Sequence, residues 1–298
     1  MSILIVGGTG RVGQEVALAL TRRGSSVTAM LRGGRNHAGS KHLLDAGINV
    51  VEGDLRNSNG LSDAVRGFET IFCSATSMPS GANDGLRLVD HDGTRSLIEA
   101  AEKQRVKRFI YVSYSGNIRI DSPLESAKRD CEDRLIASTM ETCILRPSYF
   151  MDVWLTPMLG FDPANGSARI YGSGDAKVSF ISSSNVADFA VAVATTPQRE
   201  KNTILEIGGP EPLSQLDAVR IFEKTMAKEM KVDHVPVEAL KAQHESSDPL
   251  ARSFGALMLA YASGDEISAS LETARHHQIR LRSVHEYASS LASQVSVA

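Results

Sequence analysis

Cysteines, aromatic residues and long apolar runs are all scarce in this sequence of 298 residues. The three cysteines, Cys73, Cys131 and Cys143, form no Cys-x-x-Cys pair, which excludes a disulfide framework and indicates a reducing compartment. No apolar run approaches the ~18 residues that a membrane-spanning helix needs. The short apolar run at the N-terminus follows no charged segment, which argues against a signal peptide. We therefore expect a cytoplasmic protein without membrane contact.

An excess of one charge sign is also nearly absent overall, with a formal net charge of −3. Residues 1–44 nevertheless hold six basic residues and a single acidic one, a net charge of +5, which leaves −8 for the rest of the chain. This asymmetry indicates that an anion binds near the N-terminus, and a run of solvated surface arginines is the alternative. Nucleic acid is not the expected anion, because an acidic chain with 5% aromatic residues lacks the usual footprint.

Short apolar runs alternate with amphipathic segments through the first half of the chain. The runs are typical of buried strands and lie at residues 3–6, 26–31, 48–51, 70–74, 109–112 and 142–145. The segments between them have helical spacing and lie at residues 12–20, 41–46, 61–65, 86–102 and 128–138. This alternation predicts an α/β fold, a doubly wound parallel sheet of the Rossmann type with helices on both faces.

The alternation ends after Pro147. Residues 160–174 are rich in turn formers and are expected to be a loop. Further expected elements are a strand at 178–181, a helix at 185–194, a strand at 204–207, a helix at 214–228 with Ser214 as N-cap, and mainly helix from 235 onward. We expect residues 1–150 to form a dinucleotide-binding domain to which 178–207 returns. Residues 151–298 are expected to form a smaller mixed, mostly helical substrate-binding lobe.

The strongest motif is a glycine-rich turn between the first predicted strand and helix. It contains Gly7, Gly8, Thr9, Gly10, Arg11, Val12 and Gly13. Glycines there allow a tight turn and a close approach of the backbone to a pyrophosphate, and the start of the helix supplies free N–H groups. The motif therefore predicts a dinucleotide site, with a glycine-rich turn that binds no ligand as the alternative.

The end of the second predicted strand indicates which dinucleotide binds. An NAD-selective site usually places an acidic residue about 20 residues after the motif. Here Arg32 lies 19 residues after Gly13, and Arg35 follows closely. Because arginine carries a positive charge and a fork of donors that suit a 2′-phosphate, we predict NADP(H) as the cofactor. An Arg32 that points only to water is the alternative.

Four motifs together resemble the NmrA-like atypical short-chain dehydrogenase/reductases. They are the glycine motif and the segments 52–55, 108–113 and 144–151, and the resemblance covers roughly residues 1–210 and continues weakly beyond. It implies that Asp54 and Leu55 lie beside the adenine. It also implies that Ala75 and Thr76 line the ribose and nicotinamide side, and that the segment beginning at Pro147 lies near the nicotinamide. A turn role for Asp54 is the alternative.

The sequence departs from the wider superfamily at the expected catalytic position. Many of these reductases use Tyr-x-x-x-Lys, in which the tyrosine transfers a proton and the lysine holds the nicotinamide ribose. Lys128 is present, but the tyrosine position is Leu124, which cannot transfer a proton. Lys128 is therefore expected to bind ribose or to serve as the acid. Its alternative is a lysine on the surface of a helix.

Other hydroxyl groups near the same sheet edge are candidates for the missing proton donor. Ser113 and Tyr114 follow the fifth predicted strand, and Tyr149 follows the sixth. Packing of either tyrosine with a satisfied hydroxyl, or protonation by water, are the alternatives. The histidines show no ligand cluster, so no metal is expected, and Cys73 and Cys143 are expected to be buried and inert.

These observations favour an NADPH-dependent oxidoreductase that reduces a carbonyl, enone or quinone of a small hydrophobic molecule. Because Leu124 replaces the tyrosine, an NADP(H)-binding sensor without turnover is the main alternative. A sugar-nucleotide epimerase is less favoured, because it normally needs the tyrosine and NAD. The expected partner is a small-molecule substrate, with neither nucleic acid nor membrane bound, and the protein is expected to be a monomer or a homodimer.

Overall fold

A seven-stranded sheet dominates the computed structural model, which describes residues 1–78, 84–197 and 200–295. Its strands are β1 (Ser2–Val6), β2 (Ser26–Leu31), β3 (Asn49–Glu52), β4 (Thr70–Cys73), β5 (Arg108–Val112), β6 (Glu141–Pro147) and β10 (Asn202–Ile207). Their order is β10-β6-β5-β4-β1-β2-β3, and β1 pairs in parallel with both β2 and β4. The β2–β3, β4–β5 and β5–β6 pairs are also parallel, which confirms the predicted α/β fold.

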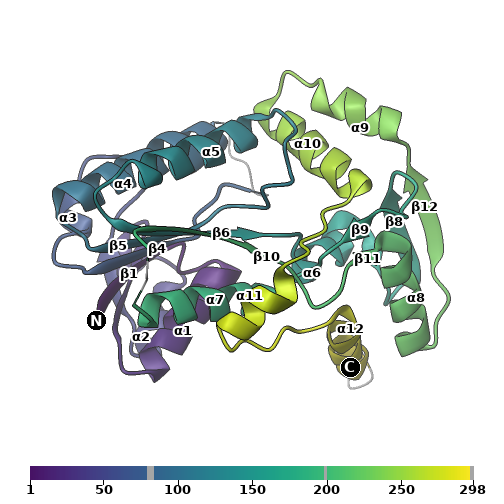
Figure 1. Cartoon of the computed structure of the whole chain (residues 1–298), viewed down its shortest axis with the longest axis horizontal. Coiled ribbons are helices and arrows are strands. Elements are labelled where there is room, and N and C mark those ends of the chain that lie inside the picture. Colours follow the sequence, from purple (N-terminus) through teal and green to yellow (C-terminus); the bar gives the residue numbers. More distant parts are fainter. Residues whose placement is uncertain (79–83, 198–199, 296–298) are drawn as a thin grey trace. The chain divides into compact units, whose positions relative to one another are not determined.

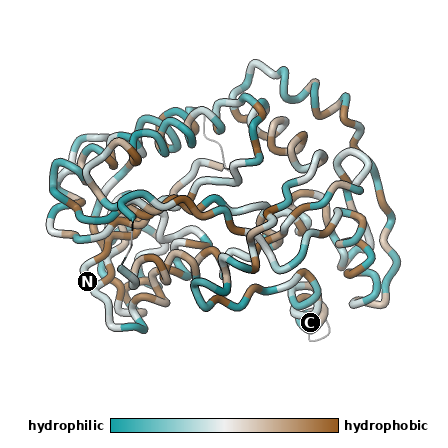
Figure 2. The backbone as a smooth tube through the Cα atoms, in the orientation of Figure 1, coloured by the Kyte–Doolittle hydropathy of each residue, from teal (hydrophilic) through white to brown (hydrophobic). Residues whose placement is uncertain are grey.

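Helices cover both faces of this sheet (Figure 1). On one face lie α3 (Leu61–Ala64), α4 (Asp92–Lys103) and α5 (Pro123–Ile136), and on the other lie α1 (Arg11–Arg22), α2 (Ser40–Asp45) and α7 (Ser183–Thr195). Figure 2 shows mostly hydrophobic strands in the middle of the sheet and mostly hydrophilic outer turns on α4 and α5. Burial of the apolar strands between two helical layers is therefore the main source of stability in this part of the chain.

In place of the single long helix predicted at 86–102, the structure has two helical segments of different kind. Residues Leu86–His91 form a π-helical segment, and regular α-helix begins only with α4 at Asp92. The start of α4 packs backbone against backbone, because a Cβ at Gly93 would lie 2.3 Å from the carbonyl oxygen of Leu55. Within the π-helical segment Asp90 is completely buried. The π-helical segment thus carries a buried carboxylate directly before the close backbone contact at the start of α4.

The chain divides into two compact units. Unit 1 comprises residues 1–113, 123–145 and 187–205, and unit 2 comprises residues 114–122, 146–186 and 206–298. The seven-stranded sheet belongs mainly to unit 1. The predicted division into a dinucleotide-binding domain at residues 1–150 and a substrate-binding lobe at 151–298 has other limits than these units, and it remains a proposal.

Unit 2 is built from short strands and helices. The elements are α6 (Met151–Trp154), β7 (Phe161–Asp162), β8 (Ser167–Tyr171), β9 (Lys177–Val178), β11 (Leu213–Ser214), α8 (Gln215–Met226), β12 (Lys231–Val235), α9 (Val237–His244), α10 (Pro249–Ser263), α11 (Ser270–His276) and α12 (Val284–Val295). Short 3-10 turns occupy Gly34–Asn36 in unit 1 and Pro157–Leu159 in unit 2. No helix among the described residues has both the length and the apolar character needed to cross a membrane.

The prediction that residues 160–174 form a loop is wrong. This segment contains β7 and β8, which form a three-stranded sheet with β12 in the order β12-β8-β7. The side chains of Ala168, Ile170 and Tyr171 in β8 are buried, and these contacts fix the strand between turn residues. The N-cap prediction for Ser214 is confirmed, because its hydroxyl accepts the N–H of Asp217 at 3.0 Å and the carboxylate of Asp217 accepts the N–H of Ser214.

Candidate cofactor and active site

The glycine turn between β1 and α1 has the geometry that a pyrophosphate requires. Gly7 adopts a φ of +93°, and the N–H of Gly10 donates to its carbonyl oxygen at 2.9 Å. A Cβ at Gly13 would lie 2.2 Å from that same oxygen, so only glycine fits there. Gly10 offers no side-chain cap, and the first turn of α1 holds no acidic residue. The start of α1 is therefore suited to an anion, and its residues fit the phosphates of a dinucleotide.

The remaining residues predicted for the phosphates lie on the surface of unit 1. Thr9 and Arg11 are exposed beside the glycine turn, and Val12 is half-buried in α1. Arg32 is exposed directly after β2, and Arg35 is exposed in the following 3-10 turn. Exposed guanidinium groups that follow β2 fit the predicted 2′-phosphate position, and this role stays a prediction.

Asp54 makes a local turn after β3. One oxygen of its carboxylate accepts the N–H of Arg56 at 3.0 Å, and its carbonyl oxygen accepts the N–H of Asn57 at 3.0 Å. This geometry matches the turn interpretation of Asp54 and leaves the adenine role as a prediction. Leu55 is buried, and its carbonyl oxygen faces Gly93 at the start of α4.

The segment after β4 passes close to the glycine turn. A Cβ at Gly7 would lie 2.9 Å from the backbone nitrogen of Ala75. Ala75 is half-buried and Thr76 is exposed, with the Thr76 hydroxyl accepting the N–H of Met78 at 3.2 Å. Two segments predicted to bind the cofactor thus lie side by side at the carboxyl ends of β1 and β4, where ligands bind in such sheets.

Lys128 is buried, with 6% of its surface exposed, so its interpretation as a surface lysine is wrong. Its ammonium group donates to the carbonyl oxygen of Val112 at 3.4 Å and lies 5.0 Å from the centre of the Tyr111 ring. The Asp90 carboxylate lies 3.9 Å away. Tyr111 is itself buried, and burial raises the pKa of its phenol well above the usual value, so it stays neutral. The carboxyl end of β5 therefore holds a cation in an almost dry environment.

Asp90 and Ser77 are functional candidates that the sequence analysis missed. The N–H and the hydroxyl of Ser77 both donate to one oxygen of the Asp90 carboxylate, at 2.9 and 2.6 Å. The other oxygen, which faces Lys128, has no hydrogen-bond partner among the described residues. A signal was present in the sequence. Asp90 lies four residues after Leu86 and seven before Leu97, so it occupies the apolar face of the predicted helix.

Ser113 follows Val112 at the end of β5 and is also buried. Its N–H donates to the carbonyl oxygen of Leu145 at 2.8 Å, while its hydroxyl has no hydrogen-bond partner within the described part of the chain. Because Lys128 bonds the carbonyl of the preceding residue, the structure brings Ser113 and Lys128 to one strand end. An unsatisfied buried hydroxyl next to a buried cation is suited to bind the oxygen of a ligand.

Tyr149 lies in unit 2 and is packed among aromatic rings. Its hydroxyl donates to the carbonyl oxygen of Leu257 at 2.9 Å, and its ring centre lies 4.7 Å from that of Trp154 and 4.9 Å from that of Tyr261. Burial raises the pKa of Tyr149 well above the usual value. These contacts favour a packing role for Tyr149. Tyr114 is half-buried against the same aromatic cluster.

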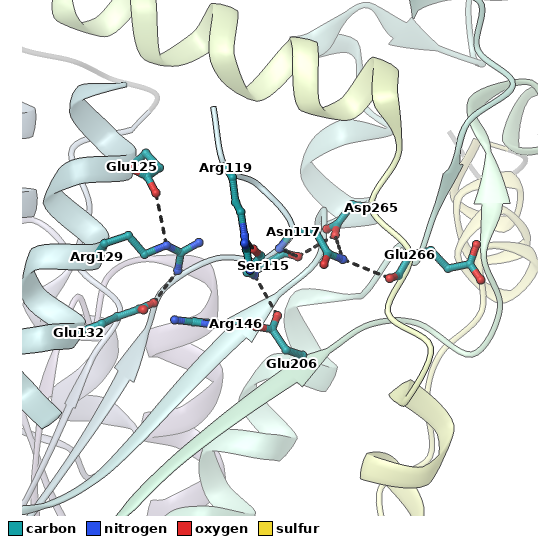
Figure 3. A network of polar contacts seen from close by, with 11 residues as sticks. Ser115, Asn117, Arg119, Glu125, Arg129, Glu132, Arg146, Glu206, Asp265 and Glu266 are labelled. Carbon is teal, nitrogen blue, oxygen red and sulfur yellow. Dashed lines mark hydrogen bonds and ion pairs between the residues drawn. The ribbon is translucent and has the colours of Figure 1, made fainter. Parts of the chain in front are cut away.

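The segment 114–122, which follows β5, is anchored within unit 2 by polar contacts (Figure 3). The N–H of Ser115 donates to the carbonyl oxygen of Pro147 at 2.9 Å, and its hydroxyl donates to the buried carboxylate of Asp265 at 2.6 Å. The N–H of Gly116 donates to Glu206, which pairs with Arg146 at 3.1 Å. A Cβ at Gly116 would lie 2.4 Å from the Glu206 carboxylate, so a larger residue there would displace the Glu206 and Arg146 side chains. Pro147 thus helps to fix this segment, and its nicotinamide role stays a prediction.

The helix that carries Lys128 has its own charge compensation. Figure 3 shows Arg129 between Glu125 and Glu132, and its guanidinium group lies 3.6 Å from the Glu125 carboxylate and 2.8 Å from that of Glu132.

Burial raises the pKa of Cys73 to about 11 and that of Cys131 to about 12. These thiols stay protonated near neutral pH and are inert, as expected for Cys73. Among the described residues no group of three or more His, Cys, Asp or Glu is arranged to hold a metal ion.

Known proteins resemble this chain in both sequence and structure. Isoflavone reductase homolog IRL of Zea mays is 29% identical over 289 residues, which cover 92% of this chain and 90% of that protein. Photosystem II assembly factor Ycf39 of Trieres chinensis is 27% identical over 247 residues, which cover 81% and 74%. The crystal structure of the Citrobacter sp. triphenylmethane reductase complexed with NADP(H) matches with a TM-score of 0.78 at 20% identity, over 97% of this chain and 99% of that one.

The structural match shows a shared fold, and the family comparison goes further. The model of the NmrA-like family matches residues 1–288, nearly the whole chain. It extends well past the residues whose four motifs predicted the same resemblance. The chain therefore belongs to the NmrA-like family.

Proposed function

We propose that this protein is an NADPH-dependent oxidoreductase that reduces a carbonyl, enone or quinone of a small hydrophobic molecule. The observation that carries the proposal is the burial of Lys128 at the carboxyl end of β5, in the same unit as the glycine turn. A lysine is almost never fully buried without a specific purpose or partner. Relatives named as reductases, among them isoflavone reductase homolog IRL of Zea mays, support the same reaction class.

The residues of unit 1 suit the parts of NADPH. The start of α1 would hold the pyrophosphate, Arg32 and Arg35 the 2′-phosphate, and Lys128 the nicotinamide ribose. The segment at Ala75 and Thr76 would line the ribose and nicotinamide side. When bound, the cofactor supplies a hydride to the substrate.

A proton must reach the substrate oxygen as the hydride reaches its carbon. Leu124, which occupies the usual tyrosine position, is buried and cannot supply it. We propose that the Ser113 hydroxyl holds the carbonyl oxygen and that the Lys128 ammonium donates the proton, after which solvent restores it. A ketone that gains one hydride and one proton in this way becomes an alcohol.

The test is oxidation of NADPH by the purified chain across ketones, enones, quinones and a triphenylmethane dye, followed in wild type and two variants. Lys128→Met is expected to lower kcat by ~100-fold or more, the usual range for a lost acid or base. Lys103→Met, which removes an exposed lysine at the end of α4, is expected to leave kcat unchanged. Equal rates in wild type and Lys128→Met would refute the catalytic role.

A second candidate is a sensor or assembly protein that binds NADP(H) without turnover. Leu124 and the similarity to Photosystem II assembly factor Ycf39 of Trieres chinensis favour it. Tight NADPH binding together with no oxidation by any member of the panel would select this candidate over the reductase.

We also propose a cytoplasmic location, a monomeric or homodimeric state, and a substrate-binding role for residues 151–298. Most residues of the buried cluster around Tyr149 lie in this range, so it has an apolar core of its own, as a separate lobe requires. Sedimentation of the purified chain distinguishes a monomer from a homodimer directly.

A further inference from the structure

We propose that Asp90 is a positioning residue of this site, whose carboxylate fixes the Lys128 ammonium and ties it to the segment that follows β4. This inference rests on the proposed function at one point, the catalytic role of Lys128. The contact itself is a property of the folded chain and is testable without turnover.

The first support is the balance of buried charge. Lys128 is 6% exposed and Asp90 is 0% exposed, and their charged groups lie 3.9 Å apart. A buried charge without a counter-charge is very costly, so each group depends on the other for its burial. The Asp90 oxygen that faces Lys128 has no hydrogen-bond partner in the described chain, so it is held for the ammonium group alone.

The second support is the pair of hydrogen bonds that the other carboxylate oxygen of Asp90 accepts. This oxygen accepts both the N–H and the hydroxyl of Ser77, which lies one residue after Thr76. A Cβ at Gly85 would lie 2.8 Å from the Cβ of Ser77, so glycine allows this segment to approach the π-helical segment. One carboxylate therefore joins two parts predicted to bind the cofactor, the Ala75–Thr76 segment and Lys128.

The third support is a second link between Asp90 and α5. The thiol of Cys131 lies 3.4 Å from the carbonyl oxygen of Asp90. Because Cys131 lies three residues after Lys128, both residues are on the same face of α5. The side chain and the backbone of Asp90 thus contact neighbouring turns of one helix, which fixes the Asp90 carboxylate relative to Lys128.

The experiment is a double-mutant cycle with Asp90→Asn, Lys128→Met and the double variant, measured first as thermal unfolding without cofactor. Asp90→Asn keeps the size of the side chain but leaves Lys128 without a counter-charge, so we expect its midpoint to fall by roughly 5–10 °C. The double variant removes both charges and is expected to recover most of that loss. Additive losses in the cycle would overturn the proposal.

Asp133→Asn is the matched control, because Asp133 is an exposed aspartate on α5 five residues after Lys128. Its midpoint and kcat are expected to match wild type. If Asp90→Asn does not fold, the double variant is still expected to fold, and failure of both to fold would contradict the proposal.

Kinetic and binding measurements then distinguish the roles of the two carboxylate oxygens of Asp90. We expect Asp90→Asn to lower kcat by ~10-fold or more in wild type and to have no further effect in Lys128→Met. Ser77→Ala keeps the charge but loosens the segment after β4, so it should raise the Kd for NADPH about 3-fold to 10-fold with little change in kcat. An Asp90→Asn effect of equal size in both backgrounds would reduce Asp90 to a structural residue.

Failure of the two proposals is distinguishable. A wild-type chain that turns over no substrate refutes the reductase, while the unfolding cycle still decides whether Asp90 and Lys128 are coupled. A reductase that shows no coupling in either cycle refutes the role of Asp90 alone.

Discussion

Arg32 is the residue on which the choice between NADP and NAD depends. It is exposed directly after β2, so a 2′-phosphate gains a charge-assisted bond there without disturbing the fold. We expect Arg32→Ala to raise the Kd for NADPH by about 10-fold or more, since bonds to charged groups contribute ~1.5–3 kcal/mol. The Kd for NADH should change little, and titration of both cofactors measures the ratio.

Arg22→Ala is the matched control for Arg32. Arg22 is an exposed arginine in the last turn of α1, and its removal should leave both dissociation constants unchanged. Equal affinities for the two cofactors in wild type, unaltered by Arg32→Ala, would exclude the predicted 2′-phosphate site.

Removal of the Tyr149 hydroxyl tests whether this residue is the proton donor. Because it donates to Leu257, we expect Tyr149→Phe to lower the free energy of unfolding by ~1 kcal/mol and to leave kcat nearly unchanged. Tyr171→Phe is the control, since its hydroxyl makes the same kind of bond to the carbonyl oxygen of Leu159 at 3.0 Å. A fall in kcat of ~100-fold in Tyr149→Phe alone would make Tyr149 the donor.

At the scale of elements, strong periodicity predicted the structure and weak periodicity did not. The predicted strand at 26–31 coincides with β2, and the helix predicted at 214–228 ends within two residues of α8. In contrast, β8 is a five-residue strand in which exposed Arg169 separates buried Ala168 from buried Ile170, and its partner β12 lies some 60 residues later. Long-range pairing of two weak strands leaves no local pattern, so neither strand was predicted.

The candidate site was predictable to a similar extent. The glycine turn and Lys128 follow local motifs, and they could be found from spacing alone. The apolar face of the predicted helix marks Asp90 as buried, but its contacts with Ser77 and Lys128 could not be predicted, because they join residues 13 and 38 positions apart through the packing of α5 on the π-helical segment. The buried network of a site depends on tertiary contacts that a single sequence does not display.

The capping box of α8 gives unit 2 a pH dependence. The Lys177 side chain and then the N–H of Ser214 bond the Asp217 carboxylate, and they lower its pKa below the usual 3.8. A lowered folded-state pKa stabilises the fold above the unfolded pKa, and this contribution disappears as the pH falls through the folded value. Asp217→Asn should therefore cost ~1 kcal/mol at neutral pH and progressively less below about pH 4.

Unfolding in denaturant at several pH values measures this difference. Asp175→Asn serves as the control, because Asp175 is an exposed acid in the same unit and should give curves parallel to wild type. A gap between Asp217→Asn and wild type that stays constant down to about pH 2 would contradict the assigned cause.

At the scale of the whole molecule, cofactor binding should appear as stability. A ligand at 100 times its Kd stabilises the folded state by ~2.7 kcal/mol, which corresponds to a rise in unfolding midpoint of about 5 °C or more for a chain of this size. We expect NADPH to produce this shift and an equal concentration of NADH a smaller one, because residues 1–44 carry a net charge of +5. Identical shifts with the two cofactors would show that the basic region does not select the 2′-phosphate.

The π-helical segment Leu86–His91 also has a consequence for how this chain diverges from its relatives. A π-helical turn holds one residue more than an α-helical turn, and each residue of an α-helix turns by about 100°. Loss of a single codon in this segment would regularise the helix and rotate the preceding residues relative to α4. A deletion between Asp90 and α4, with no substitution at all, would therefore turn the Asp90 carboxylate away from Lys128.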